Sequence, residues 1–429
     1  MASPADIQRA SVTEAVTPTE EAAEVKLEFL PSGNQKSDDS AGEEGASGGK
    51  SPLGIFEKYL TIWVVACMVV GVAIGHFLPS VPEFLKKLVV AEISLPIAVL
   101  LWGMIFPMML QIDFTSLKSV WRNPRGIVLT SGINYLIQPF TMYFLAWLFF
   151  EVVFRSFLLK PAESPDLLTI EVPSTISPNN ISSTANPTSD DSVIKQYLAG
   201  AVILGGSPCT AMVFVWSVLV HGNPSYTVTQ VAVNDLIILI AYSPTVKLLL
   251  QVSQVYIPWD TLLLSVALFV VIPLVAGVAV RYLIVHTKGV DYLTSTILPH
   301  IKPFTIVALL LTLVLIFLYQ SAQILTYPLH ILMIAVPLTI QTFVIWVLAY
   351  GLGYLIKLPF AIAAPGSMIA ASNFFELAVA VSISIFGAQD GSVLATTVGV
   401  LTEVPTMLTL VFICNKTKGL FDKRGRELR

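Results

Sequence analysis

The sequence predicts an all-α membrane protein of ten transmembrane helices in two inverted five-helix repeats, with discontinuous fourth and ninth helices. Three observations lead to this fold class. Hydrophobic residues make up 55% of the chain and charged residues only 12%, a composition typical of integral membrane proteins. The apolar residues form long continuous runs, which favours helices over a β-barrel. Two of these runs, at corresponding places in the two halves, are interrupted by glycine, proline and polar residues.

The N-terminal segment 1–53 precedes all of the apolar runs. It is rich in Ser, Glu, Ala, Gly and Asp, a composition that is too polar to build a packed core. It lacks the basic start and the apolar centre of a signal peptide, and its acidic residues argue against an organelle transit peptide. We therefore expect a disordered cytosolic tail.

Ten hydrophobic runs follow, with lengths that match the roughly 20 residues an apolar helix needs to cross hydrocarbon. They cover residues 59–78, 93–112, 126–154, 196–221, 226–252, 259–285, 304–319, 329–356, 360–386 and 393–414. An even division gives a first five-helix repeat at 54–253, with a polar loop at 155–195, and a second repeat at 254–415. Residues 416–429 remain as a basic cytosolic tail. Because five is an odd number, the two halves must have opposite topology.

The distribution of Lys and Arg predicts the orientation. If the N-terminus is cytosolic, that side of the membrane carries fifteen basic residues near the spans: Lys50, Lys58, Lys118, Arg122, Arg125, Arg281, Lys288, Lys302, Lys357, Lys416, Lys418, Lys423, Arg424, Arg426 and Arg429. The opposite side carries six: Lys86, Lys87, Arg155, Lys160, Lys195 and Lys247. Cytoplasmic loops are the basic ones, so we expect both termini in the cytosol. We also expect the plasma membrane as the location, with the vacuolar membrane as the alternative. The outward loop contains an Asn180-Ile181-Ser182 glycosylation sequon.

The fourth run is broken at its centre by Gly205-Gly206-Ser207-Pro208, directly before Cys209. Such a break frees backbone groups that hydrocarbon cannot satisfy, so it is tolerated only inside protein or beside a wet cavity. Pro208 has no N–H to lose and is expected to begin the second half-helix. Cys209 and Thr210 would then lie at the positive end of that helix, where anions are favoured.

The ninth run contains the second interruption. It carries Ala364-Pro365-Gly366-Ser367 and then Ala371-Ser372-Asn373, before an apolar stretch that includes Glu376. Two interrupted helices in corresponding halves are typical of transporters that bind their substrate near the bilayer midplane. We therefore expect a binding site where the two interruptions meet.

Three acidic residues, Asp235, Glu376 and Glu403, fall inside the predicted membrane region. A carboxylate is costly there and is a functional candidate by default, although a structural acid capped by a hydroxyl is the alternative. Glu376 stands one helical turn after Asn373 and can point into the same cavity as Cys209. We expect these acids to bind and release a coupling proton.

Polar side chains near the interruptions are the candidate substrate ligands: Ser207, Thr210, Ser372 and Asn373, together with Cys209 as the one ligand suited to a metal-like atom. Ordinary hydrogen bonds between packed helices are the competing interpretation, and we prefer it for Asn134, Gln138 and Asn234. Cys67 and Cys414 lie in separate runs, and we interpret each as a small buried hydrophobic residue.

Enzyme motifs are not found in the sequence. It has no His-Glu-x-x-His, no Gly-x-Ser-x-Gly and no phosphate-binding glycine loop. We expect a protein that is not an enzyme, needs no cofactor and binds no nucleic acid, and whose partners are the lipid bilayer, a small inorganic substrate and a coupling ion. A channel is less suited to broken helices in inverted halves than a carrier with alternating access.

Short motifs spread along the chain resemble one family of transporters. They are Lys58-Tyr-Leu-Thr-Ile-Trp63, Cys209-Thr-Ala-Met212-Val213 with Val215-Trp216, Tyr242-Ser243-Pro244, Ala371-Ser-Asn-Phe-Phe-Glu376-Leu-Ala-Val-Ala380, Val398-Gly-Val-Leu401 and Glu403-Val-Pro405. Together they resemble the yeast-type arsenical-resistance family of arsenite efflux transporters, in the bile acid/arsenite transporter superfamily. The likeness runs from about Leu53 to Cys414.

The resemblance implies ten spans in two inverted repeats with crossed discontinuous helices, and export of arsenite from the cytosol in exchange for protons. It matches Cys209 to the functional cysteine and Glu376 to the functional acid of that family. Three places along the chain depart from its usual pattern. Pro208 and Thr210 replace an Arg and an Ile around the cysteine, Asp235 replaces a Ser, and Phe106-Pro107-Met108 replaces an aromatic-Pro-Pro motif. The site is therefore more acidic than is usual in the family.

The sequence supports one mechanism and leaves two alternatives open. In the preferred one, neutral trihydroxyarsenic or its antimony analogue meets Cys209 while Ser207, Thr210 and Asn373 bond its hydroxyls, and Glu376 carries the proton, with Asp235 as a second proton site. The first alternative is a sodium-coupled organic-anion symporter of the bile acid branch. The second is a transporter-like receptor that binds its ligand without moving it.

Overall fold

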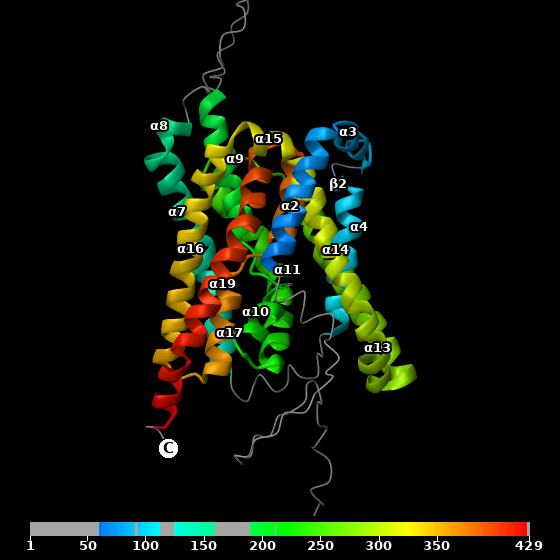
Figure 1. The fold of residues 1–429 in the computed structure, drawn as a ribbon, viewed down its shortest axis with the longest axis vertical. Helices are drawn as coiled ribbons and strands as arrows, with labels where there is room; N and C mark the ends of the chain where they lie inside the picture. Colours follow the sequence, from blue (N-terminus) through cyan, green and yellow to red (C-terminus); the bar gives the residue numbers. More distant parts are fainter. Residues whose placement is uncertain (1–59, 91–92, 112–123, 159–188, 211, 427–429) are drawn as a thin grey trace, which may run out of the picture. The chain divides into compact units, whose positions relative to one another are not determined.

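A computed structural model describes residues 60–90, 93–111, 124–158, 189–210 and 212–426. Within these residues the chain is helical (Figure 1), apart from a hairpin in which β1 (Val89–Val90) pairs antiparallel with β2 (Ile93–Ser94). The helical class predicted from the sequence is confirmed for the described part of the chain, and the short hairpin is an addition to it. The predicted tail 1–53 and the sequon at Asn180 lie outside the described residues.

The helices follow one another with short connections. In chain order they are α2 (Leu60–Phe77), α3 (Ser80–Lys86), α4 (Leu95–Gln111), α6 (Arg125–Gly132), the π-helix η1 (Ile133–Ile137), α7 (Gln138–Trp147), the π-helix η2 (Leu148–Val153), α8 (Arg155–Leu158), α9 (Ser189–Gly205), α10 (Val213–Leu219), α11 (Pro224–Val252), α12 (Trp259–Val266), the π-helix η3 (Ala267–Val271), α13 (Ile272–Tyr292), the π-helix η4 (Leu293–Ile297), α14 (Leu298–Tyr319), α15 (Ser321–Thr326), α16 (Pro328–Leu355), α17 (Phe360–Ala371), α18 (Phe375–Phe386) and α19 (Gly391–Arg426).

Five helical stretches are long and apolar enough to cross a membrane: Arg125–Val153, Pro224–Val252, Trp259–Tyr319, Pro328–Leu355 and Gly391–Phe421. Five shorter apolar helices accompany them: Ile62–Phe77, Leu95–Pro107, Ser192–Gly205, Phe360–Ala371 and Phe375–Phe386. The protein is therefore a multi-pass integral membrane protein.

The longest stretch, Trp259–Tyr319, contains 61 residues. At 1.5 Å per residue an unbroken helix of this length would extend over about 90 Å, roughly three times the hydrocarbon thickness. Gly289 interrupts it with φ 84°, a left-handed conformation that glycine adopts without steric cost. This stretch accordingly corresponds to two separate predicted runs, 259–285 and 304–319.

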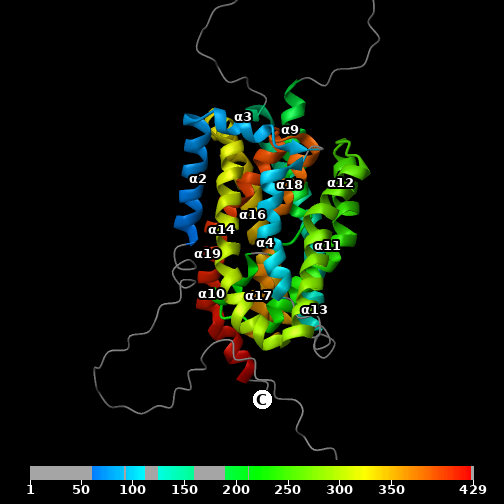
Figure 2. The same ribbon diagram turned by 90° about the vertical axis from the view of Figure 1, so that its right-hand side faces the viewer.

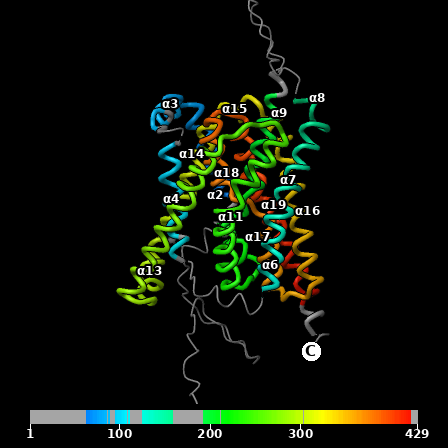
Figure 3. Tube along the Cα trace, turned by 180° about the vertical axis from the view of Figure 1, so that it is seen from behind, coloured from blue at the N-terminus to red at the C-terminus, as the bar shows by residue number. Residues whose placement is uncertain are grey.

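The helices pack as two groups. In the first, α14 lies against α2 and α4, and α13 lies against α4 (Figure 2). In the second, α16 lies against α17 and α19, and α9 lies against α7 and α19 (Figure 3). The groups meet where α18 contacts α12 and β2 and where α11 contacts α12 and η3. The long α11 belongs to the second group, where it contacts α6, α7, α9, α10 and α17.

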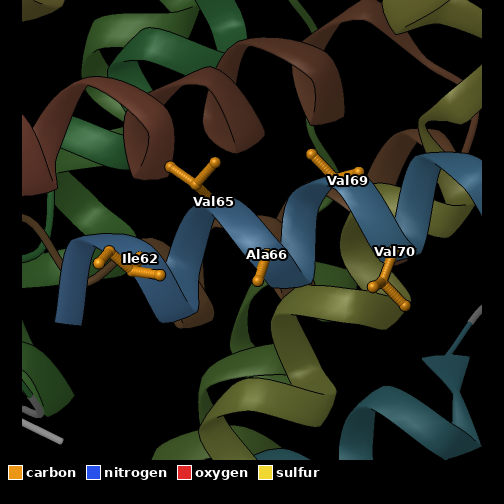
Figure 4. A pocket seen from close by; sticks show the side chains of 5 residues that line it. All are labelled: Ile62, Val65, Ala66, Val69 and Val70. Carbon is orange, nitrogen blue, oxygen red and sulfur yellow. The ribbon is translucent and has the colours of Figure 1, made fainter. Parts of the chain in front are cut away.

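An apolar hollow lies on the outer side of α2 (Figure 4). It is lined by Ile62, Val65, Ala66, Val69 and Val70. Because every lining side chain is aliphatic, this surface offers no hydrogen bond to a polar ligand, and it suits contact with lipid chains. The polar residues singled out by the sequence lie elsewhere, inside the second helix group.

Candidate functional site

The two interrupted segments meet in the structure and pair with each other. The first interruption separates α9 from α10, and the second, at Ser372–Phe374, separates α17 from α18. Pro208 and Asn373 form an antiparallel bridge. The Cys209 backbone N–H donates to the Ser372 carbonyl over 3.0 Å, and the Phe374 N–H donates to the Ser207 carbonyl over 3.0 Å. The backbone groups freed by each break are thus satisfied by the other break, which resolves their cost in a membrane.

The pairing corrects the sequence-based placement of Cys209. Pro208 does not begin a half-helix, because α10 starts only at Val213 with Met212 as its N-cap. Cys209 and Thr210 therefore lie in the non-helical connection and not in the first turn of a helix. The physical reason is that the backbone around Pro208 is extended and paired with the other break. The expected positive helix end at Cys209 is absent from the described residues.

The second interruption is shorter than expected. Pro365, Gly366 and Ser367 lie inside α17, and only Ser372, Asn373 and Phe374 are non-helical. Glycine at position 366 serves close packing here, because a Cβ would lie 2.7 Å from the Tyr226 hydroxyl and 2.9 Å from Thr130 Oγ1. The predicted break at Pro365-Gly366-Ser367 is therefore wrong, whereas that at Ser372-Asn373 is present.

Cys209 is fully buried at this crossing. Its thiol is hydrogen-bonded to the Ser372 side chain, and both Glu376 and Glu403 are near enough to interact with it electrostatically. The structure therefore places one soft sulfur beside two carboxyl groups, although the three residues are far apart in the sequence.

Glu376 lies in the first turn of α18, immediately after the second interruption. It is fully buried, and neither of its carboxyl oxygens has a hydrogen-bond partner from another residue in the described part of the chain. A buried carboxylate without a partner is costly, whereas the protonated acid is much less so. The group is therefore suited to bind a proton or a ligand.

Glu403, on α19, is held more firmly. It accepts hydrogen bonds from the Ser372 hydroxyl and from the backbone N–H of Asn373. Ser372 thus links this carboxyl to the Cys209 thiol. A change of charge at Glu403 would therefore change the electrostatic potential at the Cys209 thiol.

Asp235 and Thr210 form the other side of the site. Asp235 lies on α11 and is 1% exposed, its Oδ2 atom has no hydrogen-bond partner among the described residues, and it is close to Thr210. The Ser207 hydroxyl is also buried and has no hydrogen-bond partner among the described residues, whereas the Thr210 hydroxyl interacts with the Asp235 carboxyl. All eight residues singled out by the sequence as ligands or proton carriers are buried in this part of the structure.

The structure adds one direct partner to the crossing. Gln138 Nε2, on α7, donates to Asn373 Oδ1 over 2.7 Å. The sequence favours ordinary helix packing for Gln138, and its contact with Asn373 is therefore a finding of the structure. The neighbouring Gln230 and Tyr226, on α11, also contribute buried polar side chains that it did not single out. The four-residue spacing from Tyr226 to Gln230 and from Gln230 to Asn234 was the available signal, because it puts all three on one helix face.

The charge of the site is negative when its acids are ionised. Asp235, Glu376 and Glu403 form no ion pair within the described ranges, and no cluster of three or more His, Cys, Asp or Glu residues there could hold a metal ion. The described residues can therefore offer one thiol, several hydroxyls and amides, and acids that exchange protons. Such a set suits a carrier site for a small neutral polar species better than a resident metal centre.

Comparison with known proteins defines the class. The model of the Sodium Bile acid symporter family matches residues 98–327, and the chain belongs to that family of membrane transporters. It is 51% identical to an arsenical-resistance protein Acr3 of Alkaliphilus metalliredigens, over 87% of this chain and 96% of the relative. It is 42% identical to an uncharacterized transporter of Synechocystis over 86% of this chain and 91% of the relative. It is 29% identical to an Acr3 of Corynebacterium glutamicum over 84% of this chain and 89% of the relative.

Proposed function

We propose that the protein is a secondary active transporter that exports trivalent arsenite, antimonite or both from the cytosol in exchange for protons. The observation that carries the proposal is the meeting of two interrupted helices around a buried Cys209 with Glu376 and Glu403 beside it. The 51% identity to an arsenical-resistance protein supports the substrate class. The long and the shorter apolar helices together support ten spans in two inverted repeats, divided at 54–253 and 254–415.

Substrate binding would begin with neutral trihydroxyarsenic. The Cys209 sulfur attacks arsenic while one arsenic hydroxyl and the thiol proton leave as water, so an S–As bond replaces one As–O bond. Water reverses the exchange and frees the substrate. One thiol gives a single soft ligand, and hydrogen bonds from Ser207, Thr210, Ser372 and Asn373 would hold the remaining hydroxyls. Capture by three thiols would be too tight for release.

Proton coupling would use the buried acids. Glu376, which has no partner from another residue among those described, carries the counter-moving proton, while Glu403 and Asp235 are the further proton sites. Protonation from outside would neutralise the site and favour the return of the empty carrier. With both termini cytosolic and the protein in the plasma membrane, export removes the metalloid from the cell.

Transport into inside-out membrane vesicles tests the proposal. Acidifying the vesicle interior should accelerate arsenite uptake, a protonophore should abolish the acceleration, and sodium should have no effect. Cys209→Ala and Glu376→Gln should each lose most of the uptake. Cys67→Ala, which removes a cysteine on α2 away from the crossing, is the matched control and should keep it.

Four outcomes would contradict the proposal. Uptake that depends on a sodium gradient and ignores the proton gradient would favour the organic-anion symporter reading. Full export by Glu376→Gln would remove this acid from proton coupling, and full export by Cys209→Ala would show that transport needs no sulfur contact. Binding without counterflow of labelled arsenite would indicate a receptor.

A further inference from the structure

Four buried amide side chains lead from α11 to the helix crossing. We call Gln230, Asn234, Asn134 and Gln138 the amide ladder. Gln230 Nε2 donates to Asn234 Oδ1 over 2.9 Å, and Asn134 Nδ2 donates to the same oxygen over 3.5 Å. Gln138 continues the series by its bond to Asn373. All four side chains are fully buried.

The ladder leaves polar atoms unused. Asn134 Oδ1 and Gln138 Oε1 have no hydrogen-bond partner among the described residues, and neither does the Nδ2 group of Asn234. Buried polar atoms in proteins are nearly always paired, and leaving one unpaired costs free energy. Three neighbouring amides and the Ser207 hydroxyl thus have atoms without a partner, which indicates a place where a polar ligand binds.

The local backbone explains why two of the amides lie here. Asn134 falls in the π-helix η1, and Gln138 is the residue that follows it. Pro139 has no N–H and cannot continue the α-helical bonding, while the Gln138 N–H bonds Ile133 O five residues back. Single π-turns within α-helices are frequent at functional sites. The π-turn therefore lies at the two amides, Asn134 and Gln138, whose oxygens have no partner.

The free atoms are mostly hydrogen-bond acceptors. Two are the amide oxygens of the ladder, and others are Asp235 Oδ2 and the Glu376 oxygens. Acceptors need ligands that donate hydrogen bonds, so hydroxyl groups are suitable partners and the bare oxygens of an anion are not. Within the described ranges no basic side chain pairs with these acids, so their negative charge would also repel an anion.

We propose that the amide ladder is the specificity element that recognises the substrate by its hydroxyl groups. Its oxygens accept the O–H groups of a neutral trihydroxy metalloid, and the acidic surroundings reject oxyanions. This inference rests on the proposed function, because it names the part of the same site that distinguishes substrates. A site built to bond a hydroxyl discriminates strongly against an analogue that lacks it, since its buried groups are then left unpaired.

The test compares arsenite, which has three hydroxyls, with monomethylarsonous acid, in which a methyl group replaces one of them. Wild-type protein in inside-out vesicles should show a lower KM for arsenite. Gln138→Met and Asn134→Leu keep the size of each side chain and remove the amide oxygen, together with the N–H groups that bond Asn373 and Asn234. Each should raise the KM for arsenite by about tenfold, which is the upper range for one lost hydrogen bond, and raise that for the methylated species less. Gln251→Met changes an exposed glutamine of α11 and should alter neither value.

The outcomes separate this inference from the proposed function. If the variants change both KM values by the same factor, the ladder is structural and the inference fails while arsenite export stands. If wild-type protein transports neither compound, the proposed function fails instead. If wild-type protein has the same KM for arsenite and for monomethylarsonous acid, the inference also fails. This comparison needs no variant, so it holds even if the variants do not reach the membrane. Inhibition by arsenate that competes with arsenite, or variants that shift a sodium requirement, would also overturn it.

Discussion

At the scale of single residues, Ser372 joins the parts of the crossing. Its hydroxyl donates to Glu403 and also contacts the Cys209 thiol, and its carbonyl accepts the Cys209 N–H. A hydrogen bond to a charged group contributes about 1.5–3 kcal/mol, more than one between neutral groups. This serine therefore sets how firmly the acid and the sulfur are held together.

We expect Ser372→Ala to lower arsenite export about ten- to hundredfold, because that range corresponds to the lost bond if all of it appears in the rate. The measurement is the initial rate of uptake into inside-out vesicles, normalised to protein in the membrane. Ser384→Ala is the matched control and should transport normally, since among the described residues Ser384 bonds only the Ala380 carbonyl of its own helix α18. Equal rates for both variants would show that the Ser372 hydroxyl has no part in transport.

At the scale of helices, close packing of α9 on α19 depends on Gly200. A Cβ at this position would overlap the Ser392 carbonyl oxygen and lie 2.7 Å from the Ala395 Cβ. Because a backbone atom is in the way, no change of side-chain rotamer relieves the contact. Small residues at such interfaces are the usual means by which membrane helices approach one another.

Gly200→Ala is therefore expected to destabilise the protein by about 1–3 kcal/mol, the range for an overpacked interior. Gly351→Ala makes the same chemical change within α16, where nothing lies within 4 Å of the added Cβ, and should stabilise it by about 0.5–1 kcal/mol through helix propensity. Denaturation of the detergent-purified variants measures both. A stable Gly200→Ala protein would contradict the packing described for α9 and α19.

At the scale of the whole membrane domain, the two helix groups touch at the connection between α18 and α19. Gln320 Nε2, at the end of α14, donates to the Ala388 carbonyl over 2.6 Å, and Gln323 of α15 donates to the Gln389 carbonyl. Gln196 of α9 accepts from the Gly391 N–H over 3.2 Å. The connection is thus held from both groups, so a carrier that moves one group against the other must release part of this contact.

A covalent link at this contact should stop transport. In a Gln323→Cys, Gln389→Cys double variant, a short thiol-cleavable bifunctional reagent would tie α15 to the α18–α19 connection, and we expect loss of most arsenite uptake. Cleaving the link should restore it, and each single variant treated with the reagent should transport normally. The three native cysteines are buried, which limits their reaction. Full activity of the linked protein would place the moving interface elsewhere.

Much of the architecture was accessible from local sequence alone. Long apolar runs in a chain with only 12% charged residues predict membrane helices, because hydrocarbon permits few other backbone arrangements. Glycine, serine and proline inside the fourth run, and Ser372-Asn373 inside the ninth, predict interruptions because those residues weaken helices. An interruption at Pro365 is predicted on the same grounds but is wrong, because helix α17 continues through this residue.

The sequence by itself determined that the chain lies in the membrane, that two of its apolar segments are broken, and which buried acids and thiol deserve notice. Only the tertiary structure decided that the breaks pair with each other as extended backbone, that Ser372 joins Cys209 to Glu403, and that Gln138 reaches Asn373. The reason is physical. Helix formation and membrane insertion depend on residues near in sequence, whereas hydrogen bonds between residues up to 235 positions apart depend on how the helices pack.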